Sequence, residues 1–254
     1  MPDKMFSIEG KNIIITGASS GIGRNCAIKI AEAGANAILL ARDEKRLNET
    51  LSLLNEGKHC FYSCDVTKFD ELEKIISEVV DKIGSISGFI HSAGIEKTIP
   101  LRSMKVEIYY DLFLVNTISA FEISKIISKK KYVNKEGASF IFISSIMGVL
   151  GEVGKTAYCS SKSALIGGAK AMALELASKN IRVNTISPGM VMTKMASEMF
   201  VLLPEEKVKE IMLSHPLGLG DVDDISNACL FLLSDMSKWI TGTNLIIDGG
   251  YSAK

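Results

Sequence analysis

The sequence lacks a long hydrophobic run and an excess of either charge. No segment approaches the ~20 apolar residues that a membrane-spanning helix needs, and the opening residues, MPDKMFSIEGK, contain no apolar signal core. Lysine plus arginine total 29, equal to aspartate plus glutamate, and no basic stripe suggests a nucleic-acid surface. We therefore expect a cytoplasmic protein with no membrane partner and no nucleic-acid partner.

Cysteine is also sparse, and its spacing excludes two further classes of protein. The five cysteines are Cys26, Cys60, Cys64, Cys159 and Cys229. An odd number without paired metal spacing indicates reduced thiols rather than a disulfide scaffold. His59, Cys60 and Cys64 lie close in sequence, but a strand over residues 58–64 would place them on both of its faces. We therefore predict no metal site.

The arrangement of apolar segments predicts the fold class. The 254 residues contain no linker-like stretch and no internal repeat, so we expect one domain over residues 1–254. Short apolar runs alternate with helical segments, which indicates an α/β fold: a Rossmann-type, doubly wound parallel sheet of about seven strands. The predicted strands are Lys11–Thr16, Asn36–Ala41, Lys58–Ser63, Gly88–Ser92, Ser139–Ser144, Arg182–Ser187 and Asn244–Ile247. The predicted helices are Ile22–Ala33, Phe69–Ile83, Lys105–Lys131, Thr156–Ser178 and Val222–Leu233.

A glycine-rich segment, Gly17–Gly23 (GASSGIG), joins the first predicted strand to the first predicted helix. Glycines allow a ligand to approach the backbone, and a helix N-terminus offers free amides and a positive dipole end to a pyrophosphate. The spacing is G-x-x-x-G-x-G, which departs from the general G-x-G-x-x-G fingerprint. A turn that serves only tight strand–helix packing is the alternative.

The end of the second predicted strand bears on the choice of cofactor. In dinucleotide-binding folds, an acidic residue here binds the ribose 2′-hydroxyl, whereas an arginine accommodates a 2′-phosphate. This chain has Ala41 followed by Arg42, so we favour NADPH over NADH. NAD is the alternative, because Asp43 lies just beyond and would either cap the next helix or reach the ribose. Arg42 is otherwise a solvated residue in a charged turn with Lys45 and Arg46.

Tyr158 and Lys162 are the candidate reactive pair. Their spacing of four residues, in a helix predicted to begin at Thr156, places them on one face with Cβ atoms about 5–6 Å apart. A nearby ammonium favours the phenolate and lowers a phenol pKa that is ordinarily ~10. Ser145, at the end of an apolar strand, offers a hydroxyl to orient a carbonyl oxygen. An ordinary surface pair on a helix is the alternative reading of Tyr158 and Lys162.

Taken together and in chain order, these motifs resemble those of the short-chain dehydrogenase/reductase family over almost the whole length. The matching elements are Thr16–Gly23, Cys64-Asp65-Val66, Ala93-Gly94, Asn116 in LVNTISA, Ser145, the Tyr158–Lys162 pair, Ser187-Pro188-Gly189 and Ile247–Gly250. Among family members, the chain is most similar to 3-oxoacyl-(acyl-carrier-protein) reductases. One departure is His91-Ser92, where the family usually has Asn-Asn. We interpret His91 as structural rather than as a second acid or base.

The resemblance implies a role for each matching residue. Tyr158 would protonate the carbonyl oxygen during reduction, Lys162 would lower its pKa and bind the nicotinamide ribose, and Ser145 would hydrogen-bond the reacting oxygen. Asn116 would hold a water that links the lysine to solvent. The implied catalytic residues are therefore Asn116, Ser145, Tyr158 and Lys162. The implied cofactor-binding residues are Gly17, Ser19, Ser20, Gly21, Ile22, Gly23, Arg42, Asp65, Val66, Ala93, Gly94, Tyr158, Lys162, Pro188, Gly189, Val191 and Thr193.

The resulting hypothesis is an NADPH-dependent carbonyl reductase that acts on a 3-oxoacyl-(acyl-carrier-protein)-type substrate in fatty acid biosynthesis. The alternatives are an NAD(P)-dependent dehydrogenase of a sugar, steroid or small secondary alcohol, and a non-catalytic NAD(P)-sensing protein. The resemblance also implies a homotetramer or dimer formed through the two long helices.

Two further segments bear on the substrate. Residues 146–153 and 190–216 are apolar, and we expect them to border the substrate pocket. Their methionines are Met147, Met190, Met192, Met195 and Met199. Lys129, Lys130 and Lys131 end a predicted helix and are a candidate docking site for an acidic carrier protein. Alternatively, they complement the dipole of that helix.

Overall fold

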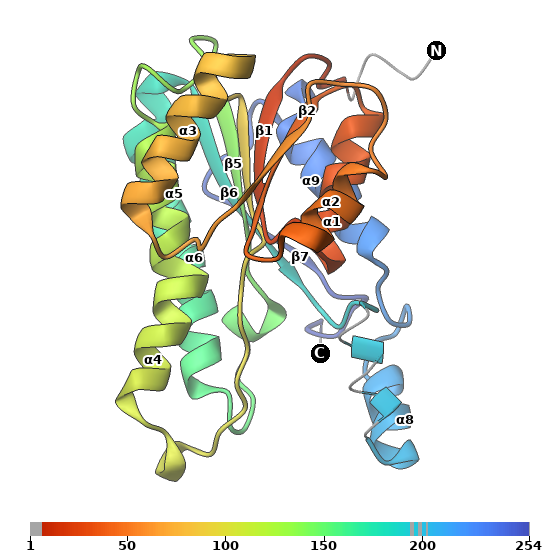
Figure 1. The fold of residues 1–254 in the computed structure, drawn as a ribbon. Helices are drawn as coiled ribbons and strands as arrows, with labels where there is room; N and C mark the ends of the chain where they lie inside the picture. The colour runs from red at the N-terminus through yellow and green to blue at the C-terminus, as the bar shows by residue number, and fades with distance from the viewer. Residues whose placement is uncertain (1–6, 194–195, 198–199, 202, 254) are drawn as a thin grey trace.

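A parallel β-sheet organises the chain (Figure 1). The computed structural model describes residues 7–193, 196–197, 200–201 and 203–253. Its sheet has seven strands in the order β3-β2-β1-β4-β5-β6-β7, and each neighbouring pair is parallel. The strands are β1 (Asn12–Thr16), β2 (Asn36–Ala41), β3 (Cys60–Ser63), β4 (Gly88–His91), β5 (Ala138–Ile143), β6 (Ile181–Pro188) and β7 (Asn244–Ile247). The predicted fold class is confirmed.

Helices cover both faces of this sheet. Figure 1 shows α3, α5 and α6 on one side of the strands and α1, α2 and α9 on the other. The helices are α1 (Gly21–Glu32), α2 (Glu44–Leu51), α3 (Phe69–Ile83), α4 (Val106–Phe113), α5 (Ser119–Ile127), α6 (Thr156–Leu176), α8 (Glu205–Leu213) and α9 (Val222–Leu233). Within the described part of the chain, none of them combines the length and the apolar character needed to cross a membrane.

The strand β1 illustrates how the sequence builds a core on each face. Successive side chains of a strand point to opposite faces. Ile14 joins the buried cluster beneath α3, α5 and α6, whereas Ile13 and Ile15 join the cluster beneath α1 and α9. All three side chains are fully buried. Burial on both faces explains why the strands read as continuous apolar runs rather than as alternating ones.

The predicted helix over Lys105–Lys131 is the main departure from expectation. The structure instead has α4, then a π-helical turn over Leu114–Ile118, then α5, which ends at Ile127. Contacts to α6 accompany the widened turn: the Thr117 hydroxyl donates to the Ser161 carbonyl at 2.8 Å, and the Asn116 amide donates to the Ser161 hydroxyl at 3.0 Å. These contacts between distant segments leave no trace in the local apolar pattern.

Candidate active site

A cleft of about 1290 Å³ opens at the carboxyl ends of the strands, beside the point where the strand order reverses between β1 and β4. Ligands of doubly wound sheets bind at this switch point. Its lining includes twelve of the predicted residues: Gly17, Ser19, Ser20, Gly21, Ile22, Arg42, Asp65, Val66, Ala93, Gly94, Lys162 and Thr193. The lining does not include seven others, which are Gly23, Asn116, Ser145, Tyr158, Pro188, Gly189 and Val191.

The glycine-rich turn shapes the floor of this cleft. A Cβ at Gly23 would lie 2.4 Å from the Gly17 carbonyl oxygen, and one at Gly17 would lie 2.8 Å from the Ala93 nitrogen. Gly17 also has a φ of 68°, which side chains disfavour. The helix α1 starts at Gly21 without a side-chain cap from Ser20, so its first amides face the cleft uncapped. This cradle fits the pyrophosphate of a dinucleotide.

Tyr158 and Lys162 share a face in the first turns of α6, as the spacing predicted. The Lys162 Nζ lies 5.9 Å from the centre of the Tyr158 ring. That ammonium donates to the Ile143 carbonyl at the end of β5, at 2.8 Å, and its side chain is buried. Ser145 follows the same strand, and its hydroxyl hydrogen-bonds the Tyr158 side chain. β5 and α6 therefore bring the three predicted side chains together, and of the three Lys162 lines the cleft.

The acid–base properties of this pair differ from the sequence-based expectation. Burial raises the pKa of Tyr158 to about 12, although the hydrogen bond with Ser145 acts in the opposite direction. Burial lowers the pKa of Lys162 to about 8, and the nearby Glu96 carboxylate opposes that shift. The expectation of a lowered tyrosine pKa was therefore wrong in sign, because desolvation of the phenol outweighs the opposing effects of Ser145 and Lys155. At neutral pH the phenol is protonated and the ammonium is mostly charged.

Asn116 lies in the π-helical turn and is fully buried. Its side chain accepts from the Ile95 amide at 2.8 Å and donates to the Ile95 carbonyl at 3.0 Å. A Cβ added at Gly94 would lie 3.4 Å from both the Asn116 Oδ1 and the Lys162 Nζ. The turn thus holds the segment after β4 against the lysine, and the direct contacts of the Asn116 side chain are the Ile95 backbone and the Ser161 hydroxyl. The water-holding role stays a prediction.

His91 ends β4 and is fully buried. The Thr16 hydroxyl accepts from the amides of Ser92 and Ala93 at 3.2 Å, so its proton is free to donate to the His91 Nδ1 at 3.0 Å. The His91 Nε2 then carries the hydrogen and faces the Ser119 hydroxyl at 3.5 Å. Burial lowers the pKa of His91 to about 3. These contacts support the structural interpretation of His91.

A second wall stands next to Tyr158 and comes from the loops after β4 and β5. The Lys155 Nζ lies 2.7 Å from Glu96 and 2.9 Å from Glu152, and so ties the two loops together. The Ile99 amide also donates to the Gly154 carbonyl at 2.7 Å. Neither ion pair was predicted, because the three residues belong to no motif. Of the methionines expected in the pocket wall, Met195 and Met199 lie outside the described residues.

Arg46 is a cleft residue that the sequence analysis did not assign. It lies in α2, four residues after Arg42, and both side chains line the cleft. Their spacing of four residues was the available signal, but Arg46 also fits a solvated, charged turn with Lys45. Asp43, between them, uses its carboxylate to accept from the Arg46 amide at 3.0 Å and so caps α2.

The lysines proposed to dock a carrier protein lie near the amino ends of the strands. The chain beyond them returns to the start of β4, where Ile86 bridges to Val133 and its amide bonds to the Tyr132 carbonyl at 2.8 Å. The cleft lies at the opposite ends of the strands. Lys129 and Lys131 also pair with Glu73, at 2.6 and 3.7 Å. Because α5 runs antiparallel to the strands, its C-terminus and these lysines do not border the cleft. Their docking role stays a prediction.

Comparisons with known proteins agree with this architecture. A family model described as Enoyl-(Acyl carrier protein) reductase matches residues 17–252. The chain is 36% identical over 250 residues to 3-oxoacyl-(acyl-carrier-protein) reductase FabG of Thermotoga maritima, covering 96% of this chain and 98% of that protein. Two solved structures are also similar. One is a short-chain type dehydrogenase/reductase from Mycobacterium ulcerans, with a TM-score of 0.91, 27% identity and coverage of 98% and 92% of the two chains.

The other structure is a 7α-hydroxysteroid dehydrogenase complexed with NADH and 7-oxo glycochenodeoxycholic acid. Its TM-score is 0.90, its identity is 28%, and the alignment covers 98% of this chain and 97% of that one. The family model, the curated relative and both structures agree in family and extend over nearly the full length. This chain therefore belongs to the short-chain dehydrogenase/reductase family and is an NAD(P)-dependent oxidoreductase.

Proposed function

We propose that this oxidoreductase is an NADPH-dependent carbonyl reductase whose substrate is a 3-oxoacyl thioester carried by an acyl carrier protein. The observation that carries the proposal is the convergence of Ser145, Tyr158 and Lys162 beside a cleft with a glycine-lined floor. The 36% identity to a 3-oxoacyl-(acyl-carrier-protein) reductase supports the substrate class.

The proposed chemistry follows from the protonation states of these side chains. The bound nicotinamide supplies the reducing equivalent to the carbonyl carbon. Tyr158, with a pKa raised to about 12, is protonated and can donate its proton to the carbonyl oxygen, while Ser145 orients that oxygen. The buried ammonium of Lys162 stabilises the phenolate that the donation leaves behind. A protonated donor suits the direction of reduction.

The preference for NADPH rests on the residues at the end of β2. Arg42 and Arg46 both line the cleft there and offer two guanidinium groups to a 2′-phosphate. Asp43 lines the cleft as well, but its carboxylate is engaged as the cap of α2. The positive pair and the engaged acid together favour the phosphorylated cofactor over NADH.

The substrate side offers apolar surface for an acyl chain. Val149, Leu150 and Val153, which follow Ser145, are 47%, 37% and 94% exposed. We also propose a homo-oligomer, because α4 and α6 expose the large side chains of Val106, Tyr110 and Leu174. Multi-angle light scattering tests the oligomer; a monomer at micromolar concentration contradicts it.

A substrate panel tests the proposed function. The purified protein is given NADPH and acetoacetyl thioesters of acyl carrier protein, coenzyme A and N-acetylcysteamine, beside a 7-oxo bile acid and small ketones. We expect the highest kcat/KM with the carrier-bound thioester and loss of that turnover in Tyr158→Phe. Preference for the bile acid would instead favour a steroid dehydrogenase. NADPH binding without turnover of any compound would favour a sensor.

A further inference from the structure

His215 occupies a connecting position that the proposed chemistry does not use. It follows α8 and is 6% exposed. Its Nδ1 lies 2.9 Å from the Ile211 carbonyl in the last turn of α8, and its Nε2 accepts from the Met190 amide at 3.3 Å. The ring also stacks on Tyr251, with centroids 4.8 Å apart and planes inclined by 27°. One imidazole thus joins α8, the end of β6 and the C-terminal segment.

The ring contacts with Ile211 and Met190 require a neutral imidazole of defined tautomer. The Ser214 hydroxyl also lies 3.1 Å from the Nδ1, and because it donates to the Ile211 carbonyl at 2.7 Å it can accept from the same N–H. The Ile211 carbonyl can only accept, so the Nδ1 carries the hydrogen. The Met190 amide can only donate, so the Nε2 must offer its lone pair. If the Nε2 were protonated as well, its N–H would face the N–H of Met190, and the hydrogen bond between the two residues would be lost.

Met190 belongs to the segment that leads from β6 into the cleft. Its carbonyl accepts from the Gly220 amide at 2.9 Å, and the Met192 amide donates to the Gly220 carbonyl at 2.8 Å. Thr193, the next residue, lines the cleft. The Met190 amide is therefore held by a side chain that can change its charge, whereas the neighbouring bonds in this segment are between backbone groups.

Two titratable groups face the His215 imidazole, and a third acts on one of them. Asp248 lies just after β7. Hydrogen bonds from Ser252 and Gly250 lower the pKa of its carboxyl, and the electrostatic effect of His215 acts in the same direction. Tyr251 contributes a ring that stacks on the imidazole. Lys207 in α8 is a cation that interacts electrostatically with Tyr251. An imidazole gains its proton between about pH 8 and pH 5.

We infer that His215 is a positioning residue whose neutral imidazole fixes residues 189–193 for cofactor binding, and whose protonation weakens that binding. This inference rests on the proposed binding of a nicotinamide cofactor at this segment. Loss of one hydrogen bond corresponds to a several-fold change in affinity, roughly two- to tenfold. NADP⁺ should therefore bind more weakly at pH 5.5 than at pH 8.

The other two histidines provide an internal control. His91 has a pKa lowered to about 3 and stays neutral over this range. His59 accepts from the Ala37 amide at 3.0 Å, a bond of the same kind, but it lies at the amino end of the sheet, away from the cleft. His59→Gln is therefore a matched substitution that should leave the pH dependence of binding unchanged.

The experiment measures the NADP⁺ dissociation constant by calorimetry at pH 5.5 and pH 8 for wild type, His215→Gln, His215→Phe and His59→Gln. The glutamine can accept from Met190 without titrating, so its affinity at pH 8 should stay within about twofold of wild type and its pH dependence should be smaller. The phenylalanine retains the stacking on Tyr251 but cannot accept, so it should bind weakly at both pH values. The titration of the cofactor's own phosphate is common to all four proteins and cancels in the comparison.

NMR of the Met190 amide supplies a readout independent of affinity and needs only wild type and His215→Gln. We expect the Met190 amide resonance to shift between pH 8 and pH 5.5 in wild type and not in His215→Gln. Equal pH dependence of binding in wild type and His215→Gln, or wild-type affinity of His215→Phe at pH 8, would overturn the inference. Failure of wild type to bind NADP⁺ or NAD⁺ at any pH would instead reject the proposed function.

Discussion

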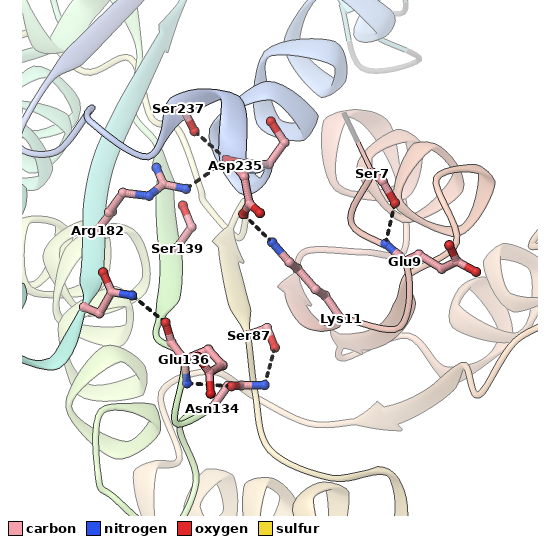
Figure 2. A network of polar contacts seen from close by, with 12 residues as sticks. Ser7, Glu9, Lys11, Ser87, Asn134, Glu136, Ser139, Arg182, Asp235 and Ser237 are labelled. Atoms are coloured by element: carbon pink, nitrogen blue, oxygen red, sulfur yellow. Dashed lines mark hydrogen bonds and ion pairs between the residues drawn. The ribbon is translucent and has the colours of Figure 1, made fainter. Parts of the chain in front are cut away.

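The two ends of the sheet are built in opposite ways. At the carboxyl ends, glycines and an uncapped helix leave backbone groups facing a cleft. At the amino ends, polar side chains cover the backbone (Figure 2). Arg182 donates to the Leu232 carbonyl at 2.7 Å, the Ser139 hydroxyl donates to the same oxygen at 2.7 Å, and Lys11 pairs with Asp235 at 3.0 Å.

At the amino ends of the strands, side chains of this chain satisfy the backbone hydrogen bonds. At the carboxyl ends, backbone groups are left for a ligand to bind. Asn12 at the start of β1 donates to the carbonyls of Ile83 and Ser85, both at 3.0 Å, and accepts from Asn36 at 2.8 Å. At the other end of β1, the amides at the start of α1 have no such side-chain cap. Substitutions at the carboxyl end should therefore affect function, with or without a loss of stability, whereas substitutions at the amino end should affect stability alone.

The largest effect should come from Tyr158→Phe at the carboxyl end. Removing the hydroxyl removes the proton donor, so kcat for ketone reduction should fall by about 10²–10⁴. Cofactor affinity should change little, because the ring and its packing remain. Steady-state kinetics with parallel NADPH titration measures both, and a kcat above a tenth of wild type would contradict the assigned role.

Gly23→Ala should damage the same end through sterics. Its Cβ would lie 2.4 Å from the Gly17 carbonyl oxygen, so the turn must shift. We expect a loss of about 1–3 kcal/mol in the free energy of unfolding and weaker NADPH binding. Gly151→Ala is the control, because its Cβ would meet no atom within 4 Å. Urea denaturation that shows the two variants equally stable would disprove the close packing.

Arg42→Asp should change cofactor choice. Loss of a charge-assisted bond and gain of a carboxylate should weaken NADPH binding by roughly tenfold to a hundredfold, with little effect on NADH. Lys45→Asp makes the same charge change in a residue that does not line the cleft. Equal losses for the two cofactors, measured by fluorescence titration, would reject the NADPH assignment.

The pH profile of reduction should report Lys162. Its pKa is lowered to about 8, so the ammonium loses its proton as pH rises through that value, while Tyr158 stays protonated to about pH 12. We expect kcat/KM to fall by up to about tenfold per pH unit above 8. A profile that stays level to pH 10 would show that the lysine charge does not assist the reaction.

The smallest effect should come from Lys11→Met at the amino end. The ion pair with Asp235 is solvent-exposed, so the free energy of unfolding should fall by less than about 1 kcal/mol, and kcat and cofactor affinity should not change. Arg182→Met, in the same network but partly buried, should cost more, about 1–3 kcal/mol. Altered NADPH binding in Lys11→Met would break the division between the two ends.

Much of the fold was readable from the sequence because it follows from local patterns. The strands of the sheet agree with prediction to within about two residues at each end, since buried parallel strands give short apolar runs with clear ends. The helix spacing of Tyr158 and Lys162 was predicted for the same reason. The π-helical turn at Asn116 was not, because its bonds to Ile95 and Ser161 join segments far apart in sequence.

Properties that depend on tertiary surroundings were the least predictable. The tyrosine pKa was wrong in direction because the extent of its burial is set by loops distant in sequence. The position of Lys129–Lys131 relative to the cleft could not be predicted, because charge pattern alone does not say at which end of the sheet a helix finishes. Arg46 was missed because a charged side chain in a turn looks the same in sequence whether it faces solvent or a cleft.

The π-helical turn over Leu114–Ile118 bears on how this chain tolerates a change of length. Such a turn holds one residue more than an α-helical turn needs. Deleting one residue would let α4 and α5 merge into a regular helix, and the apolar face of α5 would keep its contact with α3. Asn116 would then no longer meet Ile95. Such a deletion should therefore spare the scaffold while removing a side chain that positions the site.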